Sequence, residues 1–197
     1  MKPRLEFMQK KEEQLIFLLK TSSSIREGWK FLAKAVNKLI LYELPSSAWA
    51  GLATFSSFHS SLLAVATTLT SLSRPGLADL VPDKYQLATS RLASEEAGLQ
   101  DVVRTTNTLL ARTNIIFITA NITVGDYVSE DILKYLEHHK LSVSTSLLSH
   151  KPAYFYDKLA SLSGEAVSIV DRKQGQISRY LQLMEYLQSF TGQGNMN

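Results

Sequence analysis

Hydrophobic residues along much of the chain recur every three or four positions, the spacing of an amphipathic helix. The first such segment covers residues 4–20. The second covers residues 25–43, where Ser24 and Glu27 match a capping box and Pro45 follows as a stop. Its apolar positions are Trp29, Leu32, Val36, Leu39 and Ile40. The pattern predicts a helix in both segments.

Residues 44–73 contain no Asp, Glu, Lys or Arg. Apolar residues again recur at helical spacing, and most of the remainder is Ser, Thr, Ala and Gly. The hydroxyl content argues against a transmembrane span, whereas small residues allow helices to approach closely. The pattern predicts a buried or interface-forming helix over residues 46–73. An amphipathic membrane-inserting hairpin of a pore-forming protein remains the alternative.

A nearly heptad pattern begins at Tyr85, after a predicted break at Arg74-Pro75-Gly76. If it forms one helix to Gly125, that helix has some 40 residues and a length of about 60 Å. Residues 114–124 are rich in β-branched side chains, which also suit a strand. A lone strand has no obvious partner in the chain, so helix is the preferred interpretation and strand stays open.

The last third of the chain predicts three more helices, over residues 129–140, 142–163 and 166–187. The expected fold is therefore all-α, an elongated helical bundle of five to seven helices, one or two of them long, with coiled-coil packing. Residues 1–190 are expected to form a single helical domain. Residues 191–197 are expected to be a disordered tail.

Composition excludes several classes of chemistry and sets the charge. The chain has no cysteine, so disulfides, zinc–thiolate sites and thiol catalysis are excluded. The net charge of +3 and a pI near 9.0 are compatible with anionic partners without requiring them. The charged N-terminal segment has no apolar run long enough for a secretory signal. The expected location is the cytoplasm, with membrane association left open.

The main candidate site is a basic stripe formed by Arg26, Lys30, Lys34 and Lys38. These residues are four positions apart, so on a helix they lie along one side, opposite the apolar face. Residues 1–42 also hold nine Lys and Arg against four Glu. The stripe indicates a docking face for an acidic protein, an anionic lipid surface or a nucleic acid. A solvated outer face of a bundle helix explains the same pattern.

Other chemistry-bearing residues favour structural roles. His138 and His139 are adjacent, so they diverge on a helix and cannot readily share a metal ion. His59 has no nucleophile-elbow motif near it. The pair Glu95-Glu96 lacks an evident facing partner, and the aromatic run 154–156 fits core packing. We therefore expect no catalytic residues, no metal site and no cofactor.

The sequence thus predicts a non-enzymatic interaction protein, an adaptor, scaffold or assembly subunit that uses helical faces. Its expected partners are another protein or a second copy of itself. The basic stripe is the expected contact for an acidic or membrane surface, as in a peripheral membrane protein. The alternatives are a membrane-active or pore-forming helical protein built around residues 46–73, and a nucleic-acid-binding subunit.

Overall fold

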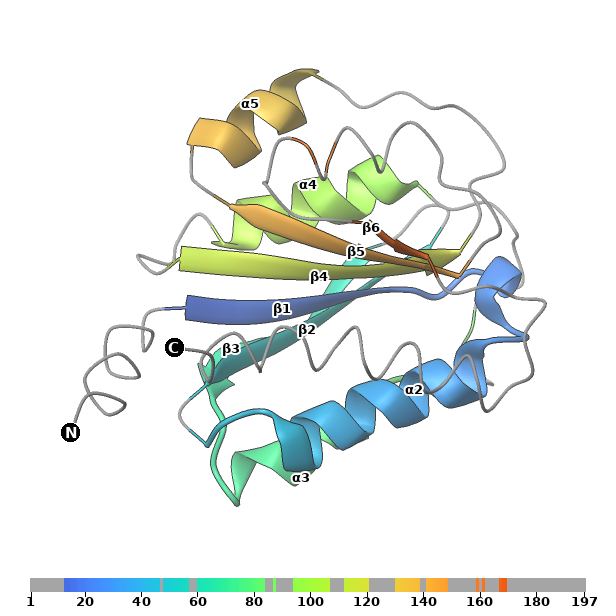
Figure 1. The fold of residues 1–197 in the computed structure, drawn as a ribbon, viewed down its shortest axis with the longest axis vertical. Coiled ribbons are helices and arrows are strands. Elements are labelled where there is room, and N and C mark those ends of the chain that lie inside the picture. Colours follow the sequence, from blue (N-terminus) through green and yellow to red (C-terminus); the bar gives the residue numbers. More distant parts are fainter. Residues whose placement is uncertain are drawn as a thin grey trace.

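The computed structural model is a layered α/β structure in which one sheet has helices on both faces (Figure 1). It describes residues 13–46, 48–56, 60–83, 87, 94–106, 112–120, 130–138, 141–148, 159, 161 and 167–169. The predicted tail at residues 191–197 and most of the predicted last helix lie outside these residues. The extent of the domain, residues 1–190, therefore stays a prediction.

The sheet has six strands in the order β3-β2-β1-β4-β5-β6. The strands are β1 (Glu13–Lys20), β2 (Trp49–Phe55), β3 (Ser60–Thr68), β4 (Arg112–Ala120), β5 (Ser142–Leu148) and β6 (Val167–Ile169). β3 pairs antiparallel with β2, whereas the other four neighbouring pairs are parallel. β1 therefore lies between two parallel partners, β2 and β4.

Successive side chains of β1 enter two separate hydrophobic cores, because neighbours in a strand point to opposite faces. Phe17 and Leu19 belong to the first core, and Ile16 and Leu18 belong to the second. All four are 0–1% exposed. A strand buried on both faces reads as an unbroken apolar run, as expected for a parallel sheet covered on both sides.

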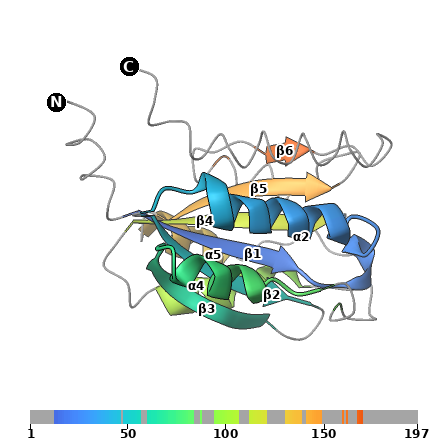
Figure 2. The same cartoon turned by 90° about the horizontal axis from the view of Figure 1, so that it is seen from below.

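Helices cover each face of the sheet (Figures 1 and 2). On one side lie α2 (Trp29–Lys38), its π-helical continuation η3 (Leu39–Glu43) and α3 (Ser73–Asp79); on the other lie α4 (Glu95–Thr106) and α5 (Glu130–His138). A short 3-10 turn, η2 (Ser23–Ile25), precedes α2. The Trp29 indole donates a 2.8 Å hydrogen bond to the Pro82 carbonyl, which ties α2 to the segment after α3.

The β2–β3 hairpin is irregular and needs a glycine. Its register shifts between Ala50 and Leu52 and again between Leu52 and Ala53. A Cβ at Gly51 would lie 2.9 Å from both the Ala64 carbonyl oxygen and the Ala66 nitrogen. Only glycine allows the two backbones to come this close, so Gly51 permits the bulges.

The all-α prediction, with its helical bundle and coiled-coil packing, is therefore wrong. Residues 13–20 of the first predicted helix form β1, the central strand. The uncharged segment, predicted as one helix over residues 46–73, instead forms β2 and β3 and reaches the first residue of α3. Pro75 and Gly76 do not break the chain, because both lie within α3.

The predicted 40-residue helix is also wrong, since its described parts are the separate elements α4 and β4. The β-branched stretch is a strand as far as Ala120, and its partners are β1 and β5. The helix predicted over residues 142–163 begins with β5, and the one predicted over residues 166–187 begins with β6.

Two of the predicted helices are confirmed. The segment predicted as residues 25–43 is helical from Trp29 to Glu43, but the capping box does not form: Gly28 is the N-cap. The segment predicted as residues 129–140 is α5. Both are strongly amphipathic, and each buries its apolar side against the sheet.

Candidate functional site

The carboxyl end of the sheet has a topological switch point between β1 and β4. The chain passes from β1 to β2 on one side and later returns to β4 on the other side. In open α/β sheets, ligands characteristically bind outside the carboxyl ends of the strands at such a point. The last residues of β1 and β4 are therefore the first place to look for a site.

A buried ion pair lies at this point. The Lys20 ammonium, at the end of β1, is 2.7 Å from Glu95 Oε1, at the start of α4. The two side chains are 2% and 6% exposed. The Thr119 hydroxyl, near the end of β4, donates to the same carboxylate oxygen at 3.4 Å. The pair joins β1, β4 and α4, although its partners are 75 residues apart in the sequence.

Strand periodicity and close packing place these groups together. Lys20 has the parity of Ile16 and Leu18, so its side chain points to the α4 face of the sheet. A Cβ at Gly98 would lie 2.7 Å from Cγ of Phe55. Gly98 thus brings the first turns of α4 close to the sheet, and with them the Glu95 carboxylate.

Hydroxyl groups follow Lys20 in the sequence. The Thr21 amide and hydroxyl both donate to the Phe55 carbonyl, at 2.8 and 3.0 Å, which ties this loop to the end of β2. The hydroxyls of Ser22 and Ser24 are 2.7 Å apart. The carboxyl edge is therefore polar but held in place by hydrogen bonds.

The basic stripe occupies a different part of the molecule, the outer side of α2. Lys30, Lys34 and Lys38 are exposed, while the opposite side of the helix is buried against the sheet. Lys38 lies 3.6 Å from Glu43. Arg26 is half-buried and lies in the turn before α2. The structure thus brings three of the four predicted residues onto one helix face.

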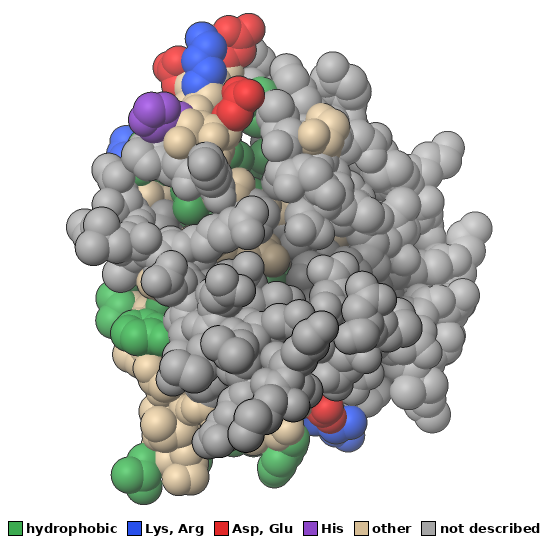
Figure 3. Space-filling view, turned by 60° about the vertical axis from the view of Figure 1, so that its left-hand side comes forward, with side chains coloured by type: hydrophobic (Ala, Val, Ile, Leu, Met, Phe, Trp, Pro, Cys, Tyr) green, Lys and Arg blue, Asp and Glu red, His purple; other side chains and the backbone are tan. Residues whose placement is uncertain are grey.

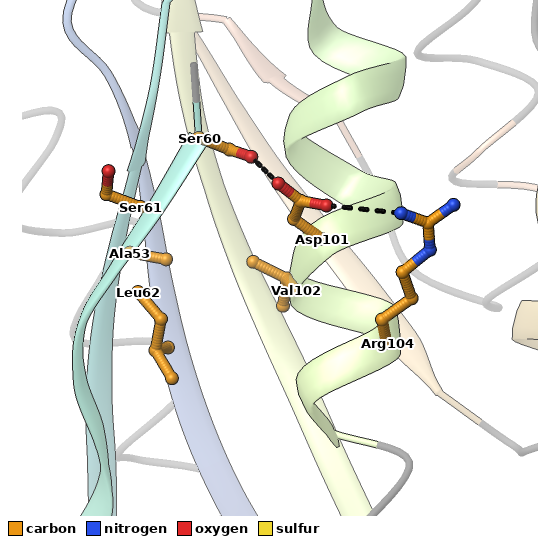
Figure 4. Close-up of a pocket in the computed structure, with 7 residues that line it drawn as sticks. All are labelled: Ala53, Ser60, Ser61, Leu62, Asp101, Val102 and Arg104. Atoms are coloured by element: carbon orange, nitrogen blue, oxygen red, sulfur yellow. Dashed lines mark hydrogen bonds and ion pairs between the residues drawn. The ribbon is translucent and has the colours of Figure 1, made fainter.

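A small pocket lies between β3 and α4 (Figure 4). Ala53, Leu62 and Val102 form its apolar part, and Ser60 reaches across to donate a hydrogen bond to Asp101. Its volume of about 180 Å³ is below the 300–1,000 Å³ typical of small-molecule sites. We therefore regard it as a surface depression rather than a ligand site.

Among the described residues, the large hydrophobic side chains that are exposed lie in and around the uncharged segment. They are Tyr42, Trp49, Val65, Leu72 and Leu80. In Figure 3 charged side chains gather on α5 at the top, and hydrophobic side chains show along the lower left edge. Scattered exposed hydrophobic residues are ordinary on a protein surface, so this face does not by itself indicate a membrane or protein contact.

The membrane-active alternative required a helix over residues 46–73, and the structure has strands there. Within the described segments, no helix has the length and apolar content needed to cross a membrane. The pore-forming helical interpretation therefore loses the element on which it was built.

The remaining candidates from the sequence are only partly described. Glu95, for which the sequence indicated no facing partner, is buried and paired with Lys20, and its neighbour Glu96 accepts a 3.2 Å hydrogen bond from Gln100. His138 is exposed at the end of α5. His59, His139 and the aromatic run 154–156 lie outside the described residues. Sequence reasoning did not identify Lys20 as a site residue. A lysine directly after the five-residue apolar run 15–19 is the signal that could have placed it at the carboxyl end of a buried strand.

Several solved structures resemble this chain. The human COPII-coat protein Sec24c matches with a TM-score of 0.67 at 12% identity, over 90% of this chain and 32% of its own. A von Willebrand factor type A structure from Catenulispora acidiphila gives 0.67 at 12% identity, over 93% and 42%. The manganese-loaded TRAP protein of Plasmodium vivax gives 0.59 at 14% identity, over 90% and 74%.

These likenesses establish a fold similar to the von Willebrand factor type A domain. They contradict the all-α prediction, as the strands of this structure do. At identities of 12–14% they establish the fold alone. The chain spans less than half the length of the Sec24c and Catenulispora structures. No protein-family model and no curated protein sequence matches the chain.

Proposed function

We propose that the protein is a non-enzymatic interaction domain that binds an acidic protein partner through the outer face of α2. The observation that carries this proposal is the exposure of Lys30, Lys34 and Lys38 on one side of a helix whose other side is buried. A helix held this way presents the three charges together on one exposed side. Clustered positive charges speed encounter with an acidic surface and favour one orientation of it.

Other features support an assembly role over catalysis. Sec24c, which has a similar fold, is a protein of the COPII coat. In this chain the ionisable pair at the switch point is buried and its two members bind each other. A lysine and a carboxylate engaged in this way are not presented to a substrate, so the exposed α2 face is the better candidate for function.

The test compares two double variants with the same change in net charge. K30E/K34E reverses the α2 face, and R104E/K134E reverses two exposed basic residues on α4 and α5. Binding of a fluorescent poly-glutamate peptide is measured by anisotropy at low salt. We expect K30E/K34E to weaken binding about tenfold, equal to the loss of two exposed ion pairs of roughly 0.7 kcal/mol each. R104E/K134E should bind nearly as well as the wild type.

Two further probes distinguish the kind of partner. Vesicles with phosphatidylserine and a duplex DNA oligonucleotide are titrated with the same three proteins. Binding of DNA but not of the peptide would move the function to nucleic-acid recognition, and binding of vesicles alone would move it to a membrane surface. Equal binding of all probes by wild type and K30E/K34E would show that the face is merely solvated.

A further inference from the structure

We infer that the Lys20 ammonium is the built-in cation of the switch-point site, in place of a bound divalent metal ion. The question arises because a protein of similar fold, the Plasmodium vivax TRAP protein, is manganese-loaded. The carboxyl edge at the switch point is where a sheet of this kind characteristically places a ligand. In this chain that edge already holds a positive charge, which is covalently attached to β1.

The oxygen groups at this ion pair are of the kind that a hard cation prefers. They are a carboxylate from Glu95 and a hydroxyl from Thr119, which also contact each other. They come from α4 and β4, while the cation comes from β1. Glu95 Oε1 accepts from both the Lys20 ammonium and the Thr119 hydroxyl, so the ion pair joins three elements without a metal ion.

A divalent ion does not fit beside this ammonium. The site is almost completely buried, so two like charges a few ångströms apart would repel strongly and with little screening. The single carboxylate is already neutralised by Lys20. In the described parts of the chain, no group of three His, Asp or Glu residues could hold a metal ion.

The consequence is a carboxyl edge whose geometry does not depend on metal supply. Breaking a buried ion pair by removing one partner is strongly destabilising, because the other charge stays buried. The edge should therefore keep its arrangement in the presence of a chelator and gain nothing from manganese. This inference is independent of the α2 partner, because Lys20 and Glu95 are buried on the α4 face of the sheet, whereas α2 covers the opposite face.

The experiment replaces the tethered cation with a free one. Lys20→Ala removes three methylenes and the ammonium, which are the atoms of propylammonium. We expect K20A to melt about 10 °C below the wild type. Propylammonium at tens of millimolar should raise its melting temperature, but not that of E95Q, which lacks the carboxylate. K30A, which removes an exposed lysine, is the matched control and should melt like the wild type under all conditions.

Manganese chloride and EDTA are tested on the wild type in the same assay, with direct titration calorimetry. We expect no shift in melting temperature and no heat of binding. A manganese-dependent rise in wild-type stability would overturn the inference. So would a K20A protein that melts like the wild type, or one that folds but is not stabilised by propylammonium. If K20A does not fold, the inference is tested by the wild-type manganese titration and by the melting temperature of K20M/E95M. That double variant, which has neither buried charge, should fold without metal.

Discussion

At the scale of single residues, the position of α4 depends on Gly98, which has no side chain. Gly98 faces Phe55. A Cβ on residue 98 would lie 2.7 Å from Cγ and 2.8 Å from Cβ of Phe55. Such contacts are shorter than side chains tolerate, so the helix or the ring has to move. Since Glu95 begins the same helix, the geometry of the buried ion pair depends on this contact.

Gly98→Ala should therefore destabilise the protein, although alanine favours a helix more than glycine does. Overpacking costs about 1–3 kcal/mol, and the gain in helix propensity offsets about 1 kcal/mol. We expect a net loss of roughly 1 kcal/mol in urea denaturation.

Gly76→Ala is the matched control for this prediction. Gly76 also lies in a helix, but a Cβ there would meet nothing within 4 Å. The substitution should leave stability unchanged or raise it by up to about 1 kcal/mol. If G98A proved as harmless as G76A, the close approach of α4 to the sheet would be wrong.

At the scale of elements, the sequence predicted helices that lie on the surface of the sheet but not the strands beneath them. α2 and α5 have one apolar and one polar side, so their periodicity is visible in the sequence. β1 and β4 are buried on both faces and appear only as apolar runs. Short apolar runs do not distinguish a strand from a buried helix.

The argument against a strand at residues 114–124 failed for a related reason. It rested on the absence of a partner strand, but the partners are β1 and β5. β1 pairs with β4 across about a hundred residues of sequence, and both partners had been assigned to helices. Non-local pairing leaves no local signal, so one wrong assignment removed the support for the next.

The candidate sites also differ in whether they depend on local spacing or on non-local strand pairing. The α2 lysines could be predicted because four-residue spacing on one helix is a local property. The Lys20–Glu95 pair could not, because its partners belong to elements 75 residues apart. Only the strand order brings the end of β1 next to the start of α4.

One long-range link between elements depends on Arg74 at the start of α3. Arg74 is 9% exposed, and its guanidinium donates 2.5 Å hydrogen bonds to the carbonyls of Ile40, in η3, and Leu44, its C-cap. These carbonyls belong to the last turn of a helix, where no backbone donor is left for them. Arg74 therefore fixes the end of the α2–η3 helix against α3.

Arg74→Met should cost about 3 kcal/mol, because two buried carbonyls lose a charged donor while the aliphatic volume is kept. The measurement is chemical denaturation, with near-UV circular dichroism as a check on packing. Arg104→Met, at an arginine that is 76% exposed, is the control and should change stability little. Equal stability of the two variants would mean that Arg74 does not hold η3.

At the scale of the whole molecule, the strand order puts β1 at the centre of both cores. It is paired on both sides, and residues 16–20 are at most 2% exposed. β3 is paired with β2 at the edge of the described sheet, and Val65 in it is 58% exposed. Backbone amides of central, buried strands open only with global unfolding, whereas edge strands open locally.

Hydrogen exchange followed by mass spectrometry should therefore rank the segments. Peptides covering residues 13–20 and 112–120 should exchange last, and those covering residues 60–68 at least about tenfold faster. The bulges of β3 add to this difference, because they interrupt its ladder with β2. The ranking also separates this fold from a helical bundle, in which residues 46–73 would be a central helix. Protection of residues 60–68 equal to that of residues 13–20 would contradict the strand order and place β3 inside the core.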